Sequence, residues 1–266
     1  MADNYKLLMN DTARKTKRII QDPIKALIAH LQESPEFADV SPDYIERLLY
    51  WFEDRLRMFQ PVIDKFIGDR LHESYRRGIV SVSKANNTPP HMLMSDNDKV
   101  KELQTVWINN FKGLNDELKL EVRNVVSNTL RSGSDPKQVI PQLRNILKAH
   151  DKGKESELNP RGMRLEQKAT IMGRTLIVEG FNVAKMQRDQ QSGIVWGGEW
   201  TAANDERTCP LCGALDGTTV KMGENFEIKY KGVNYSKPHP PLHFQCRCTR
   251  KSITFIEAKR RGLWKD

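Results

Sequence analysis

The stretch from Cys209 to Cys248 opens with Cys209-Pro-Leu-Cys212 and closes with His243-Phe-Gln-Cys246-Arg-Cys248. It contains all four cysteines of the chain. A chain of 266 residues can bury a core without covalent cross-links, so cysteines clustered in a reducing compartment indicate a metal rather than disulfides. We therefore expect this stretch to bind Zn²⁺ and to fold the end of the chain around it.

The sequence offers five candidate ligands, one more than tetrahedral zinc requires. They are Cys209, Cys212, His243, Cys246 and Cys248. The C-x2-C spacing lets a tight turn point two thiolates at one ion, and the second motif offers an H-x2-C pair with a further cysteine two residues later. The spacing favours three of these cysteines, Cys209, Cys212 and Cys246, and leaves the fourth ligand open between His243 and Cys248.

Two other functions of a cysteine cluster are weaker alternatives. A redox pair is typical of C-x-x-C at a helix N-terminus within a βαβ unit, whereas this pair is expected among turns and short strands. A zinc deaminase has H-x-E followed by P-C-x-x-C, and a zinc protease has H-E-x-x-H; the chain has none of these motifs. We therefore predict a structural zinc site.

The polar residues beside the motifs could be taken for catalytic residues, but the sequence offers a simpler structural role for each of them. Asp216 precedes Gly217, which is a turn dipeptide. Asp205 is expected to cap a turn or to pair with Arg207 or Arg247. His239 lies between two prolines and is predicted to be a loop residue rather than a ligand.

Outward from the cysteines, the region after Ser192 reads as short β segments separated by glycines. The expected strands are 194–201, 218–222, 225–230 and 233–235, and a helical turn is expected at 255–261. The fold class is thus α+β, with mainly helical N-terminal and middle regions followed by a small β-rich zinc-knuckle module. We predict three regions: a helical N-terminal region (1–90), a helical core (91–192) and the module (193–266).

The helical assignment rests on apolar residues at helical spacing. Helices are expected from about Asp11 to Gln32, from Ser41 to Tyr75, from Ser95 to Leu130, after Pro136, and from Leu165 to Gln191. Ser41-Pro42 is a good helix start, whereas Pro23 is expected to interrupt its helix and Pro61 to kink or restart its helix. Loops are expected at 86–90, 132–136 and 151–162.

The charge of the chain is +9, and most of the excess lies near the C-terminus. Residues 161–266 hold 18 Lys and Arg against 11 Asp and Glu, a net +7. A basic excess favours an anionic partner such as nucleic acid, although solubility or contact with an acidic protein surface explains it equally well. With neither a membrane-spanning run nor a secretory signal in the sequence, we expect a soluble protein of the cytosol or of a particle assembled there.

The same region resembles a known family. Trp200-Thr-Ala-Ala-Asn-Asp205-Glu-Arg207-Thr-Cys209-Pro-Leu-Cys212-Gly-Ala-Leu215-Asp216-Gly217 is followed by Pro240-Pro241-Leu242-His243-Phe-Gln-Cys246-Arg247-Cys248. This order of residues is similar to the signature of phage head morphogenesis proteins, the Mu F-like minor head proteins of tailed bacteriophages. Arg174-Thr175 lies where such proteins often carry R-T-E, but here Leu176 replaces the acid and Glu179 is the nearest one.

The resemblance implies a minor capsid protein, a virion component inside the capsid that acts in head morphogenesis and passes through the host cytoplasm during assembly. It implies the portal protein and other procapsid components as partners, packaged DNA as a non-specific contact, and no enzymatic activity. The alternative is a zinc-dependent nucleic-acid enzyme, such as a nuclease or toxin, in which the carboxylates and His243 perform chemistry.

Overall fold

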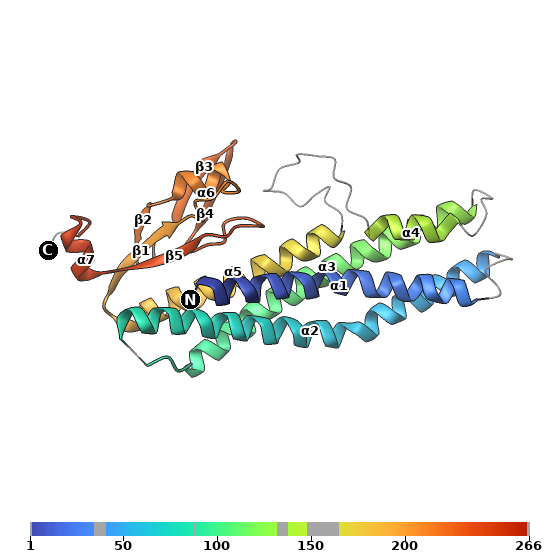
Figure 1. The fold of residues 1–266 in the computed structure, drawn as a ribbon, viewed down its shortest axis with the longest axis horizontal. Coiled ribbons are helices and arrows are strands. Elements are labelled where there is room, and N and C mark those ends of the chain that lie inside the picture. Colours follow the sequence, from blue (N-terminus) through green and yellow to red (C-terminus); the bar gives the residue numbers. More distant parts are fainter. Residues whose placement is uncertain (1, 35–40, 88, 132–137, 148–164, 265–266) are drawn as a thin grey trace.

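The computed structural model describes residues 2–34, 41–87, 89–131, 138–147 and 165–264. Five helices form an elongated bundle: α1 (Ala2–Glu33), α2 (Pro42–Asn86), α3 (Met94–Arg131), α4 (Val139–Leu147) and α5 (Leu165–Ser192). A small β-rich module follows and lies over one end of the bundle (Figure 1). The α+β prediction is therefore confirmed.

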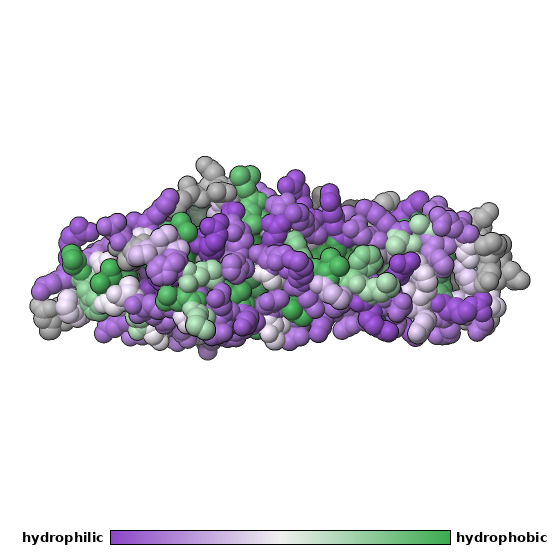
Figure 2. Space-filling model, turned by 90° about the horizontal axis from the view of Figure 1, so that it is seen from below, coloured by the Kyte–Doolittle hydropathy of each residue, from purple (hydrophilic) through white to green (hydrophobic). Residues whose placement is uncertain are grey.

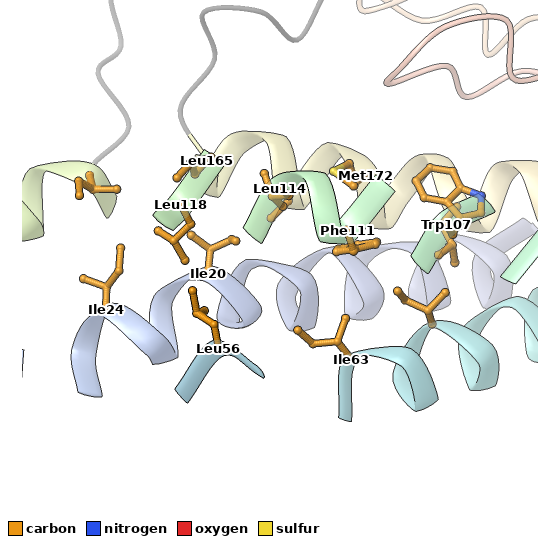
Figure 3. Close-up of a cluster of buried hydrophobic side chains, with 14 of the residues drawn as sticks. Ile20, Ile24, Leu56, Ile63, Trp107, Phe111, Leu114, Leu118, Leu165 and Met172 are labelled. Carbon is orange, nitrogen blue, oxygen red and sulfur yellow. The ribbon is translucent and has the colours of Figure 1, made fainter. Parts of the chain in front are cut away.

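One continuous hydrophobic core holds the bundle together and extends from Leu8 on α1 to Ala184 on α5. Side chains of α1, α2, α3 and α5 meet in its interior, as Figure 3 shows for Ile20, Leu56, Phe111 and Met172. The outer surface seen in Figure 2 is mostly hydrophilic, with hydrophobic residues in separate patches. The core thus crosses residue 90, while the predicted division of the chain into three regions stays a prediction.

Neither proline interrupts its helix, so the expected interruption at Pro23 and the restart at Pro61 are wrong. Pro23 lies inside α1, and Pro61 lies inside the 45-residue helix α2. A proline within a helix costs about 3 kcal/mol because it lacks an N–H and crowds the preceding turn. Fully buried side chains such as Ile20 and Ile24 flank Pro23 and keep α1 packed on both sides of it.

The helix starts follow from local chemistry. Ser41 caps α2 as predicted, its Oγ accepting a hydrogen bond of 3.1 Å from the backbone N–H of Tyr44. At the next helix, Asp96 Oδ2 accepts a hydrogen bond of 2.7 Å from the backbone N–H of Leu93. The predicted loops at 132–136 and 151–162 lie outside the described residues.

The module contains two antiparallel sheets. The first has the order β2-β1-β5 and consists of β1 (Val195–Thr201), β2 (Thr219–Lys221) and β5 (Thr249–Thr254). The second is the hairpin of β3 (Phe226–Tyr230) and β4 (Val233–Lys237). Two short helices, α6 (Pro210–Leu215) and α7 (Phe255–Arg260), complete it.

The sequence analysis did not predict β5 or α6. Strand β5 has a polar sequence in which one aliphatic residue, Ile253, is buried, so its hydrophobic pattern is too weak to recognise. It exists because it pairs with β1 along nearly its whole length. Gly198 on β1 leaves room for the side chain of Arg250 on β5, since a Cβ on Gly198 would lie 2.3 Å from Arg250 Nε.

Candidate metal centre

The structure brings all five candidate ligands into one cluster. It consists of two groups that share Cys212: Cys209, Cys212 and His243 form one, and Cys212, Cys246 and Cys248 form the other. Within each group the ligand atoms lie within 4.8 Å of one another. The Sγ atoms of Cys212 and Cys246 are 3.8 Å apart. Since the four thiols are buried and free of disulfides, they converge without a covalent link.

The first pair of cysteines is positioned by α6. Cys209 is the N-cap of this helix, and its Sγ accepts a hydrogen bond of 3.4 Å from the backbone N–H of Cys212. The expectation that this pair lies among turns and strands is therefore wrong, because a short helix begins inside the motif. A redox pair would also need a βαβ unit with parallel strands, whereas the strands of the described module pair in antiparallel fashion.

The second motif turns His243 toward the first. Its Nε2 lies 3.2 Å from Cys209 Sγ and 3.1 Å from Cys212 Sγ. Its Nδ1 lies 2.5 Å from the carbonyl oxygen of Phe244, an acceptor that requires the proton to be on Nδ1. Nε2 then faces the sulfur atoms and is the ring nitrogen placed to bind a metal ion.

Helix α5 supports the second motif from below. Thr175 Oγ1 accepts a hydrogen bond of 3.2 Å from the backbone N–H of Gln245, whose φ of 67° places it in the left-handed region. Asn182 Nδ2 donates to the carbonyl oxygen of Cys248 at 3.2 Å, and Asn182 Oδ1 accepts from the backbone N–H of Arg250 at 2.8 Å. Hydrogen bonds from α5 therefore fix the backbone of the second motif at Gln245 and Cys248, and of Arg250 just after it.

The thiols perturb one another strongly. Hydrogen bonding with Cys212 and with His243 lowers the pKa of Cys209 to about 4, and hydrogen bonding with Cys212 and Cys248 lowers the pKa of Cys246 well below its usual value. Hydrogen bonds with Cys209 and Cys246 raise the pKa of Cys212. Cys212 lowers the pKa of Cys248, but Cys246 and burial outweigh it and bring that pKa to about 12. Sulfur atoms this close cannot all be ionised unless a cation lies between them.

The carboxylates beside the motifs are engaged elsewhere. Asp205 forms a bidentate ion pair with Arg247 and accepts a hydrogen bond of 3.0 Å from the backbone N–H of Arg207. It therefore both caps a turn and forms an ion pair. Asp216 accepts from the backbone N–H of Ala202 at 2.8 Å and from Asn204 at 2.9 Å. Both arrangements fit the structural interpretation of these residues.

A small pocket of about 80 Å³ opens onto the cysteines. Three arginines line it, Arg174, Arg207 and Arg247, and its described lining contains no carboxylate. Burial and the charges of the other two arginines lower the pKa of Arg174. His239, predicted to be a loop residue, lies in a bend and belongs to neither ligand group of the described residues.

A buried polar junction joins α5 to the module and was missed by the sequence analysis. Arg250 on β5 forms a fully buried ion pair with Asp189 on α5, and Ser252 Oγ donates to the same carboxylate at 2.7 Å. A lone arginine and aspartate 61 residues apart carry no sequence pattern that would indicate this pairing. The residues Arg174 and Thr175, noted for their position in the motif, were the nearest signal that α5 contacts the cysteines.

Comparison with known proteins identifies the region that contains this cluster. Residues 120–251 match the family model described as Phage Mu protein F like protein. Comparison with curated proteins and with solved structures gives no significant match. Residues 120–251 therefore belong to the Mu F-like family, which confirms the resemblance and indicates a phage head morphogenesis protein.

Proposed function

We propose that this Mu F-like chain is a minor head protein of a tailed bacteriophage, located inside the capsid, which acts with the portal protein and packaged DNA. The family match carries the proposal, since this family is structural and implies other capsid components as partners. Among the described residues, no helix combines the length and the apolar character that a membrane crossing needs. We further propose that the chain has no enzymatic activity and that Zn²⁺ holds its C-terminal module together.

The donor set fits zinc. Thiolates and imidazole are the ligands of structural zinc sites, and a tetrahedron with Zn–S bonds of about 2.3 Å separates two sulfur atoms by about 3.8 Å. Cys212 and Cys246 have this separation. The distances from His243 Nε2 to Cys209 Sγ and Cys212 Sγ are 3.2 and 3.1 Å, somewhat below the roughly 3.5 Å of an ideal tetrahedron.

We propose Cys209, Cys212, His243 and Cys246 as the ligands. Nε2 of His243 already contacts two sulfur atoms, whereas Cys248 lies beside Cys212 and Cys246 as a neighbour in the second group. Bound zinc would compensate the negative charge of the thiolates, and the arginines of the small pocket would offset the remaining charge. Its contribution is structural, because the described pocket lining has no carboxylate to act as a base.

Elemental analysis of protein purified without chelators tests the metal, and one zinc per chain is expected. Cobalt substitution tests the ligands, because the sulfur-to-cobalt charge-transfer band grows with the number of thiolates. We expect Cys248→Ser to keep this band and His243→Ala to lower the metal affinity. The reverse result would place Cys248 in the coordination sphere, and a metal-free protein would refute the site.

The alternative, a zinc-dependent nuclease or toxin, is tested on the same variants. A structural zinc predicts no turnover of nucleic acid by wild type or by Asp205→Ala. A metal-dependent nuclease activity that disappears in folded, zinc-loaded His243→Ala protein would establish the enzyme instead.

Two experiments test the partners. The portal protein should copurify with the chain on co-expression, and its failure to do so in both orientations of the affinity tag would contradict the assembly role. DNA binding should be weak and independent of sequence, because residues 161–266 carry a net +7, and it should fall steeply as salt rises. Strong or sequence-selective binding would contradict it.

A further inference from the structure

A cleft of about 740 Å³ is lined by residues of both the bundle and the module. One wall comes from the first turns of α1, the last turns of α2 and the middle of α5. The other comes from the end of β1, the loop before α6 and the start of β5. The cleft is separate from the small pocket over the cysteines, with which it shares Ala203, Arg207 and Arg247.

The walls of the cleft are strongly basic. The bundle contributes Lys6, Arg76, Arg77, Lys84 and Lys185, and the module contributes Arg207 and Arg247. Two carboxylates offset these seven cations: Glu73 pairs with Arg76 and Arg77, and Asp205 pairs with Arg247. Glu73 lies outside the described lining, which itself holds seven cations and one carboxylate, so this concave surface favours an anionic ligand.

Lys185 on α5 is a partly buried cation of this surface. Its Nζ lies over the ring of Phe181 at 5.6 Å from the centroid. Asp189 attracts it from a distance, but that carboxylate is already bound by Arg250 and Ser252. Burial lowers the pKa of Lys185 to about 8, so a carboxylate that entered the cleft would stabilise the charged form.

The floor of the cleft is apolar and is not a platform for bases. Tyr5, Met9, Val80 and Phe181 line it together with Ala202. The rings of Tyr5 and Phe181 are 4.6 Å apart and tilted by 41°, and Lys185 occupies a further position over Phe181. Because these rings are engaged with each other and with Lys185, they do not offer the free faces on which the bases of single-stranded nucleic acid stack.

We propose that this cleft binds a short acidic peptide segment of a partner protein, with carboxylates on its cationic rim and an apolar side chain on its floor. Pockets of about 300–1,000 Å³ hold drug-sized ligands, so the volume suits a few residues rather than a length of duplex. The positive charge of the rim complements Asp and Glu side chains, and the apolar floor favours burial of an apolar residue between them. The inference rests on the proposed assembly role, in which the chain has protein partners.

Fluorescence anisotropy with zinc-loaded, full-length protein tests the proposal. The probe is a short labelled peptide that alternates Glu with Leu, and the comparison ligands are a Glu–Ser peptide of equal charge and length and an oligothymidylate of similar length. We expect the Glu–Leu peptide to bind at least about tenfold more tightly than the Glu–Ser peptide. Tighter binding of the oligothymidylate, or equal binding of the two peptides, would overturn the proposal.

Matched charge reversals locate the site. Lys6→Glu with Lys84→Glu changes two exposed rim residues, and Arg18→Glu with Lys112→Glu makes the same change of net charge on exposed residues outside the cleft lining. The rim pair should weaken peptide binding by about tenfold or more, and the control pair by much less. Equal losses would show attraction to net charge alone and would overturn the proposal.

Lys185→Met keeps the volume of the side chain and removes the partly buried cation, so it should weaken binding of the Glu–Leu peptide with helical content and zinc content unchanged. Unchanged affinity would remove Lys185 from the site. Zinc content and portal copurification of the wild-type protein test the proposed function without using these substitutions. Failure of peptide binding is therefore distinguishable from failure of the proposed function.

Discussion

The bundle and the C-terminal module obtain their stability in different ways. The bundle buries one continuous hydrophobic core built from five helices, in which Ile20, Leu71, Phe111 and Leu176 are all inaccessible to solvent. The main core of the module is far smaller and contains all four cysteines next to residues such as Trp200 and Phe226. A region with so few apolar side chains needs another source of stability, and we propose that a metal ion bound by the clustered ligands supplies it.

The largest expected difference between the two regions follows removal of the metal. Cys209→Ser or Cys212→Ser should release zinc and unfold the module, because binding of structural zinc contributes on the order of 10–16 kcal/mol in small zinc domains. The bundle should keep its helical circular dichroism, since its core contains no ligand. Hydrogen exchange resolves the outcome: protection should be lost from about Trp196 onward and kept in α1 to α3. Simultaneous loss in both regions would mean that the bundle depends on the metal as well.

The next largest effect is expected at the junction between the regions. Asp189→Asn leaves the guanidinium of Arg250 buried without its counter-charge, which should cost about 3–5 kcal/mol. Asp205→Asn is the matched control, because it breaks an exposed pair with Arg247 and should cost much less. Chemical denaturation of both variants measures the difference. Equal losses would show that burial of the Asp189 pair adds nothing.

An intermediate effect is expected from pH. Burial lowers the pKa of His239 to about 4, below its ordinary value of 6.5. A lowered pKa in the folded state means that the unfolded state binds the proton first, so stability is full above pH 6.5 and falls as the pH drops toward 4. The loss should approach about 3 kcal/mol.

His239→Asn isolates this contribution, because zinc release also destabilises the module in acid. The difference in unfolding free energy between wild type and variant should shrink as the pH falls from 7 to 4. A difference that is independent of pH would show that His239 does not titrate in this range.

The smallest effect is expected in the bundle. Ser41→Ala removes the cap of α2 and should cost about 1 kcal/mol, whereas Ser41→Asp should retain stability because a carboxylate also accepts the N–H of Tyr44. Thermal unfolding followed at helical wavelengths measures both variants, and the zinc content should not change. A loss as large for Asp as for Ala would show that the cap does not stabilise the helix.

Sequence alone was sufficient for features that depend on neighbouring residues. Helical spacing of apolar residues predicted α1, α2, α3 and α5, and the side-chain chemistry of Ser41-Pro42 predicted the start of α2. The two cysteine motifs indicated the five candidate ligands that the structure brings together, because soft ligands at short spacing have few other uses. These signals are local, so no knowledge of the fold was needed to recognise them.

Only the tertiary structure decided what depends on distant partners. It carried α1 and α2 through Pro23 and Pro61, because packing on both sides of each proline outweighs a local penalty. It paired Arg250 with Asp189 and built the basic cleft from residues as far apart as Lys6 and Arg247. Burial and the convergence of charges are properties of the folded chain, and no periodicity or motif in the sequence encodes which distant residues will meet.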